Sequence, residues 1–495
     1  MIFAVELTPA IDATGTLQTF YFTDGDGIAT LPSDTPANTF IRPWLIDPGL
    51  IRRELFTDGK LLGAVRSDYG ELVLANVDGV LDAWIDYGIA GRTAIIRASD
   101  DEAAPYPSGW TTVLVTQMER ISVDFDELRI TLRDMLSYLD RPACPNAFAG
   151  TGGLEGPASL TGTLKPRLYG DALLIPAVLV DAAKQIYLVH ENPVSVPGLL
   201  TAWDGGAAYT MDTPYASLSA LQTTAPAPGH ACAFESGPTY VRLGTNPTYG
   251  LYCNSNGLAM NGGSAWISNI RHEIGLPAAQ VASGGFAFGG YAGDNESLLD
   301  LAVNIGQASR VVPSINRLGA FAGIALTAPS AGAAVATYRR ADCLAIRREA
   351  PGGVPEPAGT VRVRAGRNYM QGRQLNPSAD LATRPWLAQA WYSNAAVVRS
   401  DVLAKYPKAP TIEISIDTMA GSVTGIASQY ETLFCAERHQ YRLTMPLTLA
   451  HLTRDLGQVV MLQMARFNLA SGRPMLIIGI ELALREREIE LTVWG

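Results

Sequence analysis

The sequence predicts a mainly β, multidomain protein with α/β insertions between its two ends. Three observations lead to this expectation. The chain has 495 residues, enough for about three or four domains of ordinary size. It is rich in Gly (48) and Pro (31), which favour turns, and 47% of its residues are hydrophobic, enough for several buried cores. Runs of alternating apolar and polar residues occur near both ends, and this is the period of a strand with one buried face.

Residues 1–165 are predicted to form an N-terminal β domain. Residues 18–23 are an apolar strand, and the Asp-Gly-Asp-Gly sequence at 24–27 is a strong turn signal. Residues 71–76 have the composition of another strand. The Gly, Pro, Ser and Thr residues of 144–165 indicate a long loop at the end of the domain.

Two further elements belong to this domain. Residues 80–87 have the spacing of a short helix, and residues 112–133 carry the clearest strand alternation of the chain, with a break at Asp126 and Glu127 that predicts a hairpin. The predicted helix has on one face Leu81, Trp84 and Ile85. The apolar positions of the predicted hairpin are Ile121, Val123, Phe125, Leu128, Ile130 and Leu132.

Residues 166–263 are predicted to form a β-rich middle module of short strands and loops, because Gly, Thr, Ala, Tyr and Pro dominate its second half. Its aromatic residues have two interpretations. They either form an exposed platform for a sugar or a partner protein, or they fill a small core, and we favour the core. They are Trp203, Tyr209, Tyr215, Tyr240, Tyr249 and Tyr252.

Residues 264–345 are predicted to form a small α/β domain. Residues 266–274 are a candidate helix, and 297–309 carry apolar residues at helical spacing after a cap at Asp294 or Asn295. A turn and an apolar strand follow.

Residues 346–495 are predicted to form a C-terminal β domain. A helix is expected at 426–439, and in the last strand of the chain every second residue is apolar, so that one face is buried and the other is wet. The strands expected in this domain are 360–364, 411–416, 458–463, 474–482 and 488–494.

Charge narrows the classes of function. The chain carries 37 Lys and Arg against 47 Asp and Glu, a net charge of −10, without a block of basic residues. Because a protein that holds nucleic acid needs cations for the phosphates, stable binding of DNA is not expected. An acidic wall along which DNA slides is compatible with this charge, as is an ordinary acidic soluble protein.

Cysteine placement and hydropathy exclude further classes. No two of the five cysteines lie within four residues of each other, so we expect buried free thiols in a reducing cytoplasm instead of a zinc or redox site. The start of the chain lacks the basic and apolar regions of a signal peptide, and no run of 18 apolar residues predicts a membrane span. The cysteines are Cys144, Cys232, Cys253, Cys343 and Cys435.

Motifs that carry catalytic chemistry are incomplete. His272 and Glu273 begin like the zinc motif HExxH, but Leu276 stands where the second histidine is needed. The acidic turn at 24–27 lacks the distal Glu of a calcium loop. No nucleophile elbow, phosphate-binding loop or dinucleotide fingerprint occurs, so we expect no catalytic, cofactor-binding or metal residues and no enzymatic activity.

Several stretches resemble one protein family. They are residues 35–92, in which GELVLANVDGVLDAW is the most telling part, and residues 165–189, 202–215 and 488–495. They resemble the tail hub proteins of bacteriophages with long non-contractile tails, in patches over nearly the whole chain.

The resemblance implies a trimer in which two β-barrel-like domains per subunit, here 1–165 and 346–495, form a pseudo-sixfold ring around the DNA exit channel at the tail tip of the virion. It implies as partners the distal tail ring, the tape measure protein and tail fibre or tip proteins, with assembly in the host cytoplasm and DNA passing without specific binding. A trimer with duplicated domains can meet a sixfold tube without inequivalent contacts.

The chain departs from some members of this family. Some hubs hold an iron–sulfur cluster near the C-terminus, but only Cys435 lies there, so no cluster is expected. No fused lysozyme or peptidase motif is present. Two alternatives stay open: a distal tail or fibre-attachment protein, and a tail-associated glycosidase or sugar-binding module.

Overall fold

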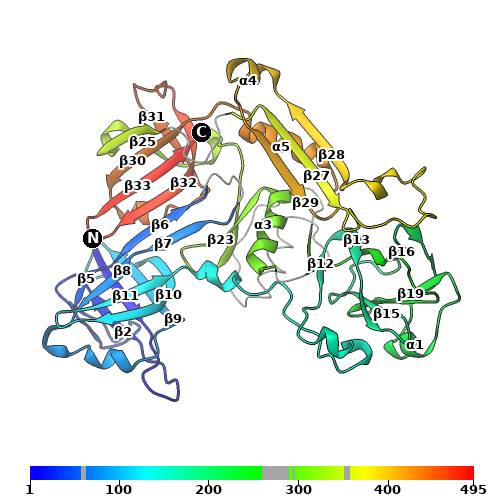
Figure 1. Cartoon of the computed structure of the whole chain (residues 1–495). Helices are drawn as coiled ribbons and strands as arrows, with labels where there is room; N and C mark the ends of the chain where they lie inside the picture. The colour runs from blue at the N-terminus through cyan, green and yellow to red at the C-terminus, as the bar shows by residue number, and fades with distance from the viewer. Residues whose placement is uncertain (57–62, 259–288, 294–295, 350–356) are drawn as a thin grey trace.

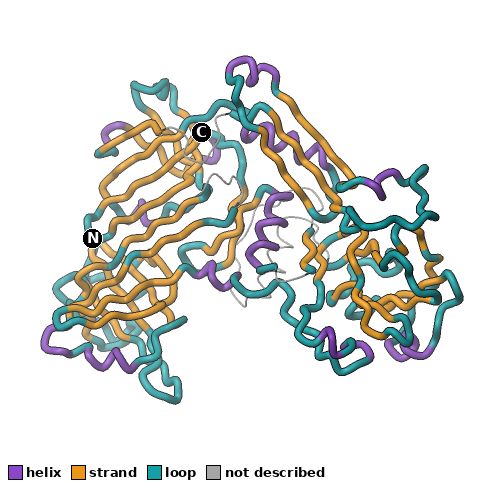
Figure 2. Tube along the Cα trace, viewed as in Figure 1, coloured by secondary structure: helices purple, strands orange, loops and turns teal. Residues whose placement is uncertain are grey.

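A computed structural model describes residues 1–56, 63–258, 289–293, 296–349 and 357–495. The protein is mainly β with several units, which confirms the predicted fold class (Figure 1, Figure 2). Strands from the two ends of the chain lie side by side in one half of the molecule, and the middle module occupies the other half. Among the described residues no helix has the length and hydropathy to cross a membrane.

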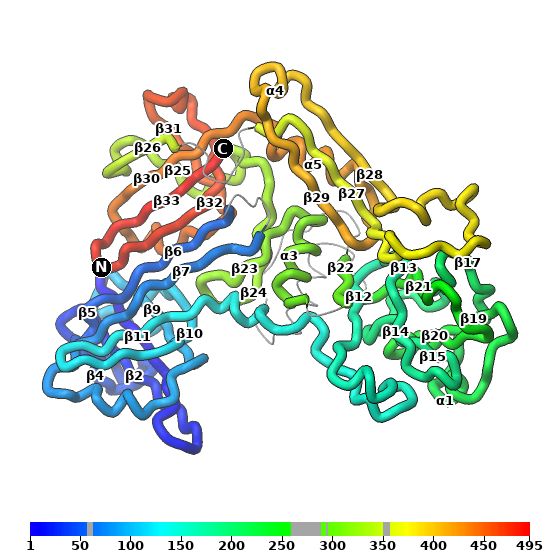
Figure 3. Tube along the Cα trace, in the orientation of Figure 1, coloured from blue at the N-terminus to red at the C-terminus, as the bar shows by residue number. Residues whose placement is uncertain are grey.

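The N-terminal sheet has seven strands in the order β2-β1-β9-β10-β11-β8-β5, all joined by antiparallel pairing (Figure 3). Its buried face carries large aliphatic side chains from nearly every strand. The strands are β1 (Ile2–Leu7), β2 (Phe20–Thr23), β5 (Leu45–Asp47), β8 (Glu71–Ala75), β9 (Arg92–Ser99), β10 (Thr111–Val123) and β11 (Glu127–Arg133).

The C-terminal sheet includes two strands that come from the N-terminal part of the chain. Strand β32 pairs with β31 over residues 473–476 and with β6 over residues 479–483, so β31 and β6 follow each other along one edge of β32. Strand β7 then pairs with β6. The members are β6 (Leu50–Glu54), β7 (Arg66–Tyr69), β25 (Ala334–Arg339), β26 (Ala345–Glu349), β30 (Gln440–Pro446), β31 (Val459–Gln463), β32 (Arg473–Ala483) and β33 (Glu488–Trp494).

One buried arginine fixes this junction. The side chain of Arg53 on β6 is only 3% exposed and forms an ion pair with Asp455, which lies just before β31. Its Nη2 donates to Ser314 Oγ at 3.1 Å and to the carbonyl of Ile315 at 2.9 Å. A buried guanidinium must have such partners, because desolvation without them costs several kcal/mol. Arg53 therefore connects three segments that are far apart in sequence.

A small α/β unit lies between the two ends of the chain. The hairpin of β23 (Val311–Ile315) and β24 (Phe321–Ala325) packs against helix α3 (Leu298–Ser309). The same hairpin contacts the N-terminal sheet, since Val115 N–H donates to the carbonyl of Arg317 at 2.7 Å and the Arg317 guanidinium returns to the carbonyl of Thr112. The hydrophobic core is continuous through the two β sheets and this unit.

The middle module is built from two sheets. One contains β13 (Asp171–Pro176), β21 (Leu251–Asn256), β16 (Thr201–Asp204) and β17 (Ala207–Ala208). The other contains β14 (Val178–Asp181), β15 (Ile186–His190), β20 (Thr239–Leu243), β19 (His230–Phe234) and β18 (Thr210–Met211).

A separate three-stranded sheet is formed by residues after the middle module. Its central strand is β27 (Thr360–Arg367), which lies between β28 (Trp391–Val398) and β29 (Thr411–Ile416). One face of this sheet is covered by α3 and by α5 (Val423–Phe434).

Most predicted strands are confirmed, but the helix expected at 426–439 ends at Phe434, and three further local predictions are wrong. The predicted helix at 80–87 is a short 3₁₀ helix, Asp82–Asp86, and Ile85 is 71% exposed instead of buried. A 3₁₀ helix has three residues per turn, so residues three apart share a face and Ile85 leaves the face of Leu81 and Trp84. Phe125 was expected among the apolar positions of the hairpin, but its side chain is 93% exposed. The strand ends at Val123, so the turn and not the strand alternation determines where the Phe125 side chain points.

The third correction concerns the cap of α3. Ser297 is the N-cap, and its side-chain oxygen accepts from the backbone N–H of Asp300, whereas Asp294 and Asn295 lie outside the described residues. The candidate helix at 266–274 also lies outside them. The division into four domains stays a prediction; strand β25 lies before the expected boundary at 345/346 and β26 crosses it, and both belong to the C-terminal sheet.

The junction gives the first testable prediction. Replacing Arg53 by Leu should lower the free energy of unfolding by about 3 kcal/mol, because Asp455 and two further oxygens lose a buried cation. Arg52, its neighbour on β6, is 43% exposed and pairs only with surface carboxylates, so Arg52→Leu should cost less than about 1 kcal/mol. Urea unfolding followed by circular dichroism measures both. Equal losses in the two variants would contradict the role of Arg53 at the junction.

Candidate functional site

The cysteines do not form a reactive site. All five are buried free thiols. Burial raises the pKa of Cys144, Cys343 and Cys435 to about 11 in each case, so these thiols stay protonated at neutral pH and are poor nucleophiles. Within the described part of the chain, no group of three His, Cys, Asp or Glu side chains is arranged to hold a metal ion.

Two histidines of the middle module form contacts within the fold. His190 is buried, its Nε2 lies 3.0 Å from Ser255 Oγ, and burial lowers its pKa to about 4. His230 Nδ1 lies 2.8 Å from Asp212 Oδ1. His230 is on β19, two residues before Cys232. Burial raises the pKa of the Cys232 thiol, which donates to the carbonyl of Thr213 at 3.0 Å. His272 and Glu273 lie outside the described residues.

The acidic turn at 24–27 is also engaged within the fold. Asp24 Oδ1 accepts the backbone N–H of Phe3 at 2.6 Å, and Asp24 Oδ2 lies 3.7 Å from Arg487. The carboxylate thus connects the first strand to the loop after β32. Both carboxylate oxygens of Asp24 therefore have partners within the fold.

The aromatic residues of the middle module fill cores. Trp203, Tyr240 and Tyr252 are buried, and Tyr209, Tyr215 and Tyr249 are half-buried. Since none of the six is exposed, the structure favours the core interpretation over an exposed platform. The side chain of Trp203 packs with Tyr252 against the loop before β28 through Met370 and Leu387.

A wide polar surface covers the open face of the C-terminal sheet. Strands β7, β6, β32, β33, β30 and β26 place charged residues on this face, and the alternate residues of β6, β32, β33 and β30 are buried. We call it the charged sheet face. It consists of Arg52, Glu54, Arg66, Asp68, Arg347, Glu349, Arg442, Glu481 and Glu490.

Two arginines of this face are paired with carboxylates across the strands. Arg52 Nε lies 3.5 Å from Glu481, and Arg442 lies 2.9 Å from both Glu349 and Glu490. Partial burial raises the pKa of Glu490, and the Arg442 guanidinium acts in the opposite direction. Because these two arginines are occupied by carboxylates, they offer little to a phosphate.

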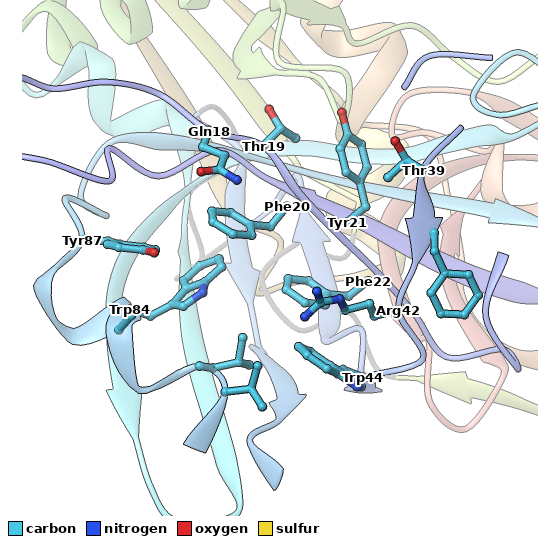
Figure 4. Close-up of a pocket in the computed structure, with 14 residues that line it drawn as sticks. Gln18, Thr19, Phe20, Tyr21, Phe22, Thr39, Arg42, Trp44, Trp84 and Tyr87 are labelled. Atoms are coloured by element: carbon cyan, nitrogen blue, oxygen red, sulfur yellow. The ribbon is translucent and has the colours of Figure 1, made fainter. Parts of the chain in front are cut away.

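A second feature is an aromatic cavity on the N-terminal domain (Figure 4). It has a volume of about 270 Å³ and lies where β2 meets the 3₁₀ segment at 82–86 and the chain around Trp44. The rings of Phe22 and Trp44 are stacked with centroids 6.0 Å apart, and those of Phe20 and Trp84 are 5.1 Å apart. We call this the aromatic cavity. Its lining includes Gln18, Phe20, Phe22, Phe40, Arg42, Trp44, Val80, Trp84 and Tyr87.

The lining of the aromatic cavity combines aromatic rings with polar side chains, among them Gln18, Thr19 and Thr39. The single charged side chain in the lining is Arg42, whose Cζ lies 4.5 Å from the centroid of the Trp44 ring. This cation–π contact occupies one face of the arginine and keeps it at the wall. A cavity of this size accepts one or two side chains of a partner and is small for an extended ligand.

Comparison with known proteins gives only a partial likeness. No family model matches the sequence, and no curated protein matches it. Among solved structures, the tail protein from Neisseria meningitidis MC58 is 10% identical, with 100% of this chain and 96% of that chain covered and a TM-score of 0.40.

Two further structures show a similar degree of likeness. The 43 kDa tail protein of prophage MuSo2 from Shewanella oneidensis is 9% identical, with 99% and 98% covered and a TM-score of 0.38. A chain of the virion of a native gene transfer agent particle is 14% identical, with 67% and 84% covered and a TM-score of 0.44. Likenesses at this level do not assign a function.

Sequence reasoning did not predict the aromatic cavity. Phe20 and Phe22 stand two residues apart on a strand, so a shared face could be predicted from the sequence alone. Their meeting with Trp84 depends on the 3₁₀ turn and on the way the loop after β8 crosses β2, for which no local signal exists.

The aromatic cavity gives the second prediction. Trp84 is buried and contacts three other rings, so Trp84→Ala should reduce the free energy of unfolding by about 3 kcal/mol or more. Phe40 lines the same cavity but is 59% exposed, so Phe40→Ala should cost less than about 1 kcal/mol. Chemical unfolding of the two variants measures both. A larger loss for Phe40 would show that Trp84 is not the packing centre of the cavity.

Proposed function

We propose that this protein is a non-enzymatic structural subunit of a bacteriophage tail tip, the baseplate hub, and that three copies form a ring around the DNA exit channel. The observation that carries the proposal is the joining of the two ends of the chain into side-by-side sheets through β6 and β32. Such a joint makes a rigid wall out of two β domains. The stretches that resemble tail hub proteins include part of this joint, since β6 and β7 lie within residues 35–92.

The charged sheet face supports a position beside passing DNA. A channel wall must present polar groups to water without holding phosphates, and Arg52 and Arg442, which are already paired with carboxylates, meet both demands. The net charge of −10 acts in the same direction, because like charges repel. In the proposed ring this face is directed toward the channel.

The proposal includes partners and location. The ring meets the distal tail ring on one side and fibre or tip proteins on the other, and the end of the tape measure lies within it. Three subunits with two β domains each can match a sixfold tube through similar contacts. The protein would thus be found at the tail tip of the virion after assembly in the host cytoplasm.

The alternatives differ in what they require. A distal tail or fibre-attachment protein would form a hexamer. A glycosidase needs two carboxyl groups in a cleft with free access to a sugar. The buried thiols, the paired carboxylates of the charged sheet face and the buried aromatics of the middle module offer no support for catalysis or for a sugar platform in the described residues.

The third prediction is the mass of the protein in solution. Light scattering should give three times the chain mass of 52.8 kDa, either for the protein alone or after addition of the tail-tube protein. The control is the same measurement with an unrelated protein in place of the tube protein. A stable hexamer would favour the distal tail protein instead. A monomer that does not bind the tail-tube protein would contradict the hub proposal and favour the enzymatic or sugar-binding alternatives.

A further inference from the structure

Two loops of the N-terminal domain expose large apolar side chains. The first loop is residues 77–86, between β8 and β9, and the second is the tip of the β10–β11 hairpin, residues 124–126. Four apolar side chains of these loops are 51% to 93% exposed, and the most exposed is the ring of Phe125. Exposed apolar side chains that gather in one place indicate a binding surface. The four are Val77, Val80, Ile85 and Phe125.

A single buried asparagine holds the two loops together. Asn76 has no exposed surface, and its backbone N–H donates to the carbonyl of Asp126 at 2.8 Å. Its Nδ2 donates to the carbonyl of Asp124 at 3.1 Å, and its Oδ1 accepts the N–H of Leu81 at 2.8 Å. The backbone beside Val77, Val80 and Phe125 is therefore held in a fixed arrangement by the bonds of Asn76. This lowers the entropy that a partner must remove on binding.

The same loops carry an unusual density of acidic residues. Five exposed aspartates alternate with the apolar side chains, while residues 76–91 and 121–128 contain no Lys or Arg. Within the described part of the chain, none of the five forms an ion pair. We call the two loops together the acidic-apolar surface. Its aspartates are Asp78, Asp82, Asp86, Asp124 and Asp126.

The aromatic cavity adjoins this surface. Val80 belongs to both, and Leu81 and Trp84 of the same loop form part of the cavity wall. A segment that lies on the acidic-apolar surface thus has a cavity of about 270 Å³ beside it, into which one apolar side chain can enter. A buried anchor surrounded by polar contacts is the usual arrangement of a specific interface.

We propose that the acidic-apolar surface and the aromatic cavity form a docking site for a partner protein segment in which Lys or Arg residues alternate with apolar residues, such as one face of a basic amphipathic helix. The aspartates bind the cations of the segment, Phe125 and Ile85 cover its apolar residues, and one of these enters the cavity. Charge complementarity selects this occupant. A second copy of this acidic chain would bring aspartates against aspartates, and nucleic acid would bring phosphates against them.

The site is independent of the hub proposal, because it rests only on the described residues of the N-terminal domain. It would exist in a monomer, and its loss would leave the ring and the charged sheet face unchanged. A solution mass other than that of a trimer would therefore not affect it.

The test uses the full chain and a fluorescein-labelled peptide of about 14 residues, two heptads of Leu and Lys that form an amphipathic helix. Fluorescence anisotropy measures binding at about 50 mM and about 300 mM salt, where screening weakens exposed ion pairs. The matched probe has Glu in place of every Lys. Binding of the Lys peptide, about tenfold weaker in the higher salt, and absence of binding by the Glu peptide are expected.

Variants separate the site from general attraction by the acidic protein. Asp78→Asn, Asp86→Asn and Asp126→Asn together should weaken binding about tenfold. Asn suits position 78, whose backbone has a φ of 63° that Asn tolerates. The control neutralises three exposed carboxylates outside both loops and should leave binding unchanged: Asp26→Asn, Glu102→Gln and Glu486→Gln.

The apolar contribution has its own variant. Phe125→Ser removes a ring that is 93% exposed, so folding is unaffected, and binding should weaken about tenfold. Three results would overturn the proposal: no binding of the Lys peptide at the lower salt, equal binding of the Glu peptide, or equal weakening by the control variant and by the variant of the acidic-apolar surface.

Discussion

The structure depends on the pairing of β6 with β32, which is fixed by the buried guanidinium of Arg53. The pairing joins residue 53 to a strand more than 400 positions later in the chain. A cation removed from water in this way requires its carboxylate and its carbonyl partner to stay in place. The pair of strands β6 and β7, the β23–β24 hairpin and the loop before β31 are therefore fixed relative to one another.

One of the two proposed functional surfaces follows from this constraint. The charged sheet face continues from the C-terminal strands onto β6 and β7 only because the hairpin extends that sheet. The acidic-apolar surface lies on the N-terminal domain, whose sheet is tied to the rest by the Arg317 contacts with β10. The proposed wall and the proposed docking site thus lie on sheets that share one continuous hydrophobic core.

Local patterns in the sequence predicted most strands correctly, because alternation reports directly on one buried and one wet face. The final strand and the β10–β11 hairpin are examples. The errors arose where the local period was not the deciding factor. Ile85 fits a helix of 3.6 residues per turn, but the segment is a 3₁₀ helix, and Phe125 continues a strand alternation that ends two residues earlier.

The long-range features had no signal in the sequence. Nothing in residues 50–69 distinguishes a hairpin of the N-terminal sheet from one that joins the C-terminal sheet, and an Arg on a strand is usually a surface residue. The aromatic cavity and the bonds of Asn76 likewise combine residues from separate loops. The alternation of apolar and polar residues indicates which face of a strand is buried. It does not indicate which distant segments come into contact, because those contacts depend on how all the elements pack together.

Hydrogen exchange of the native protein, followed by mass spectrometry, is the sharpest test of the β6–β32 pairing. Leu55 N–H donates to the carbonyl of Ile478 at 2.8 Å, next to the paired residues of β6 and β32. We expect peptides covering β6 to exchange as slowly as those covering β33, in the middle of the C-terminal sheet. If β6 exchanged within seconds while β32 and β33 stayed protected, the pairing would be too weak to join the two ends of the chain into one unit, and Arg53 would not fix the junction.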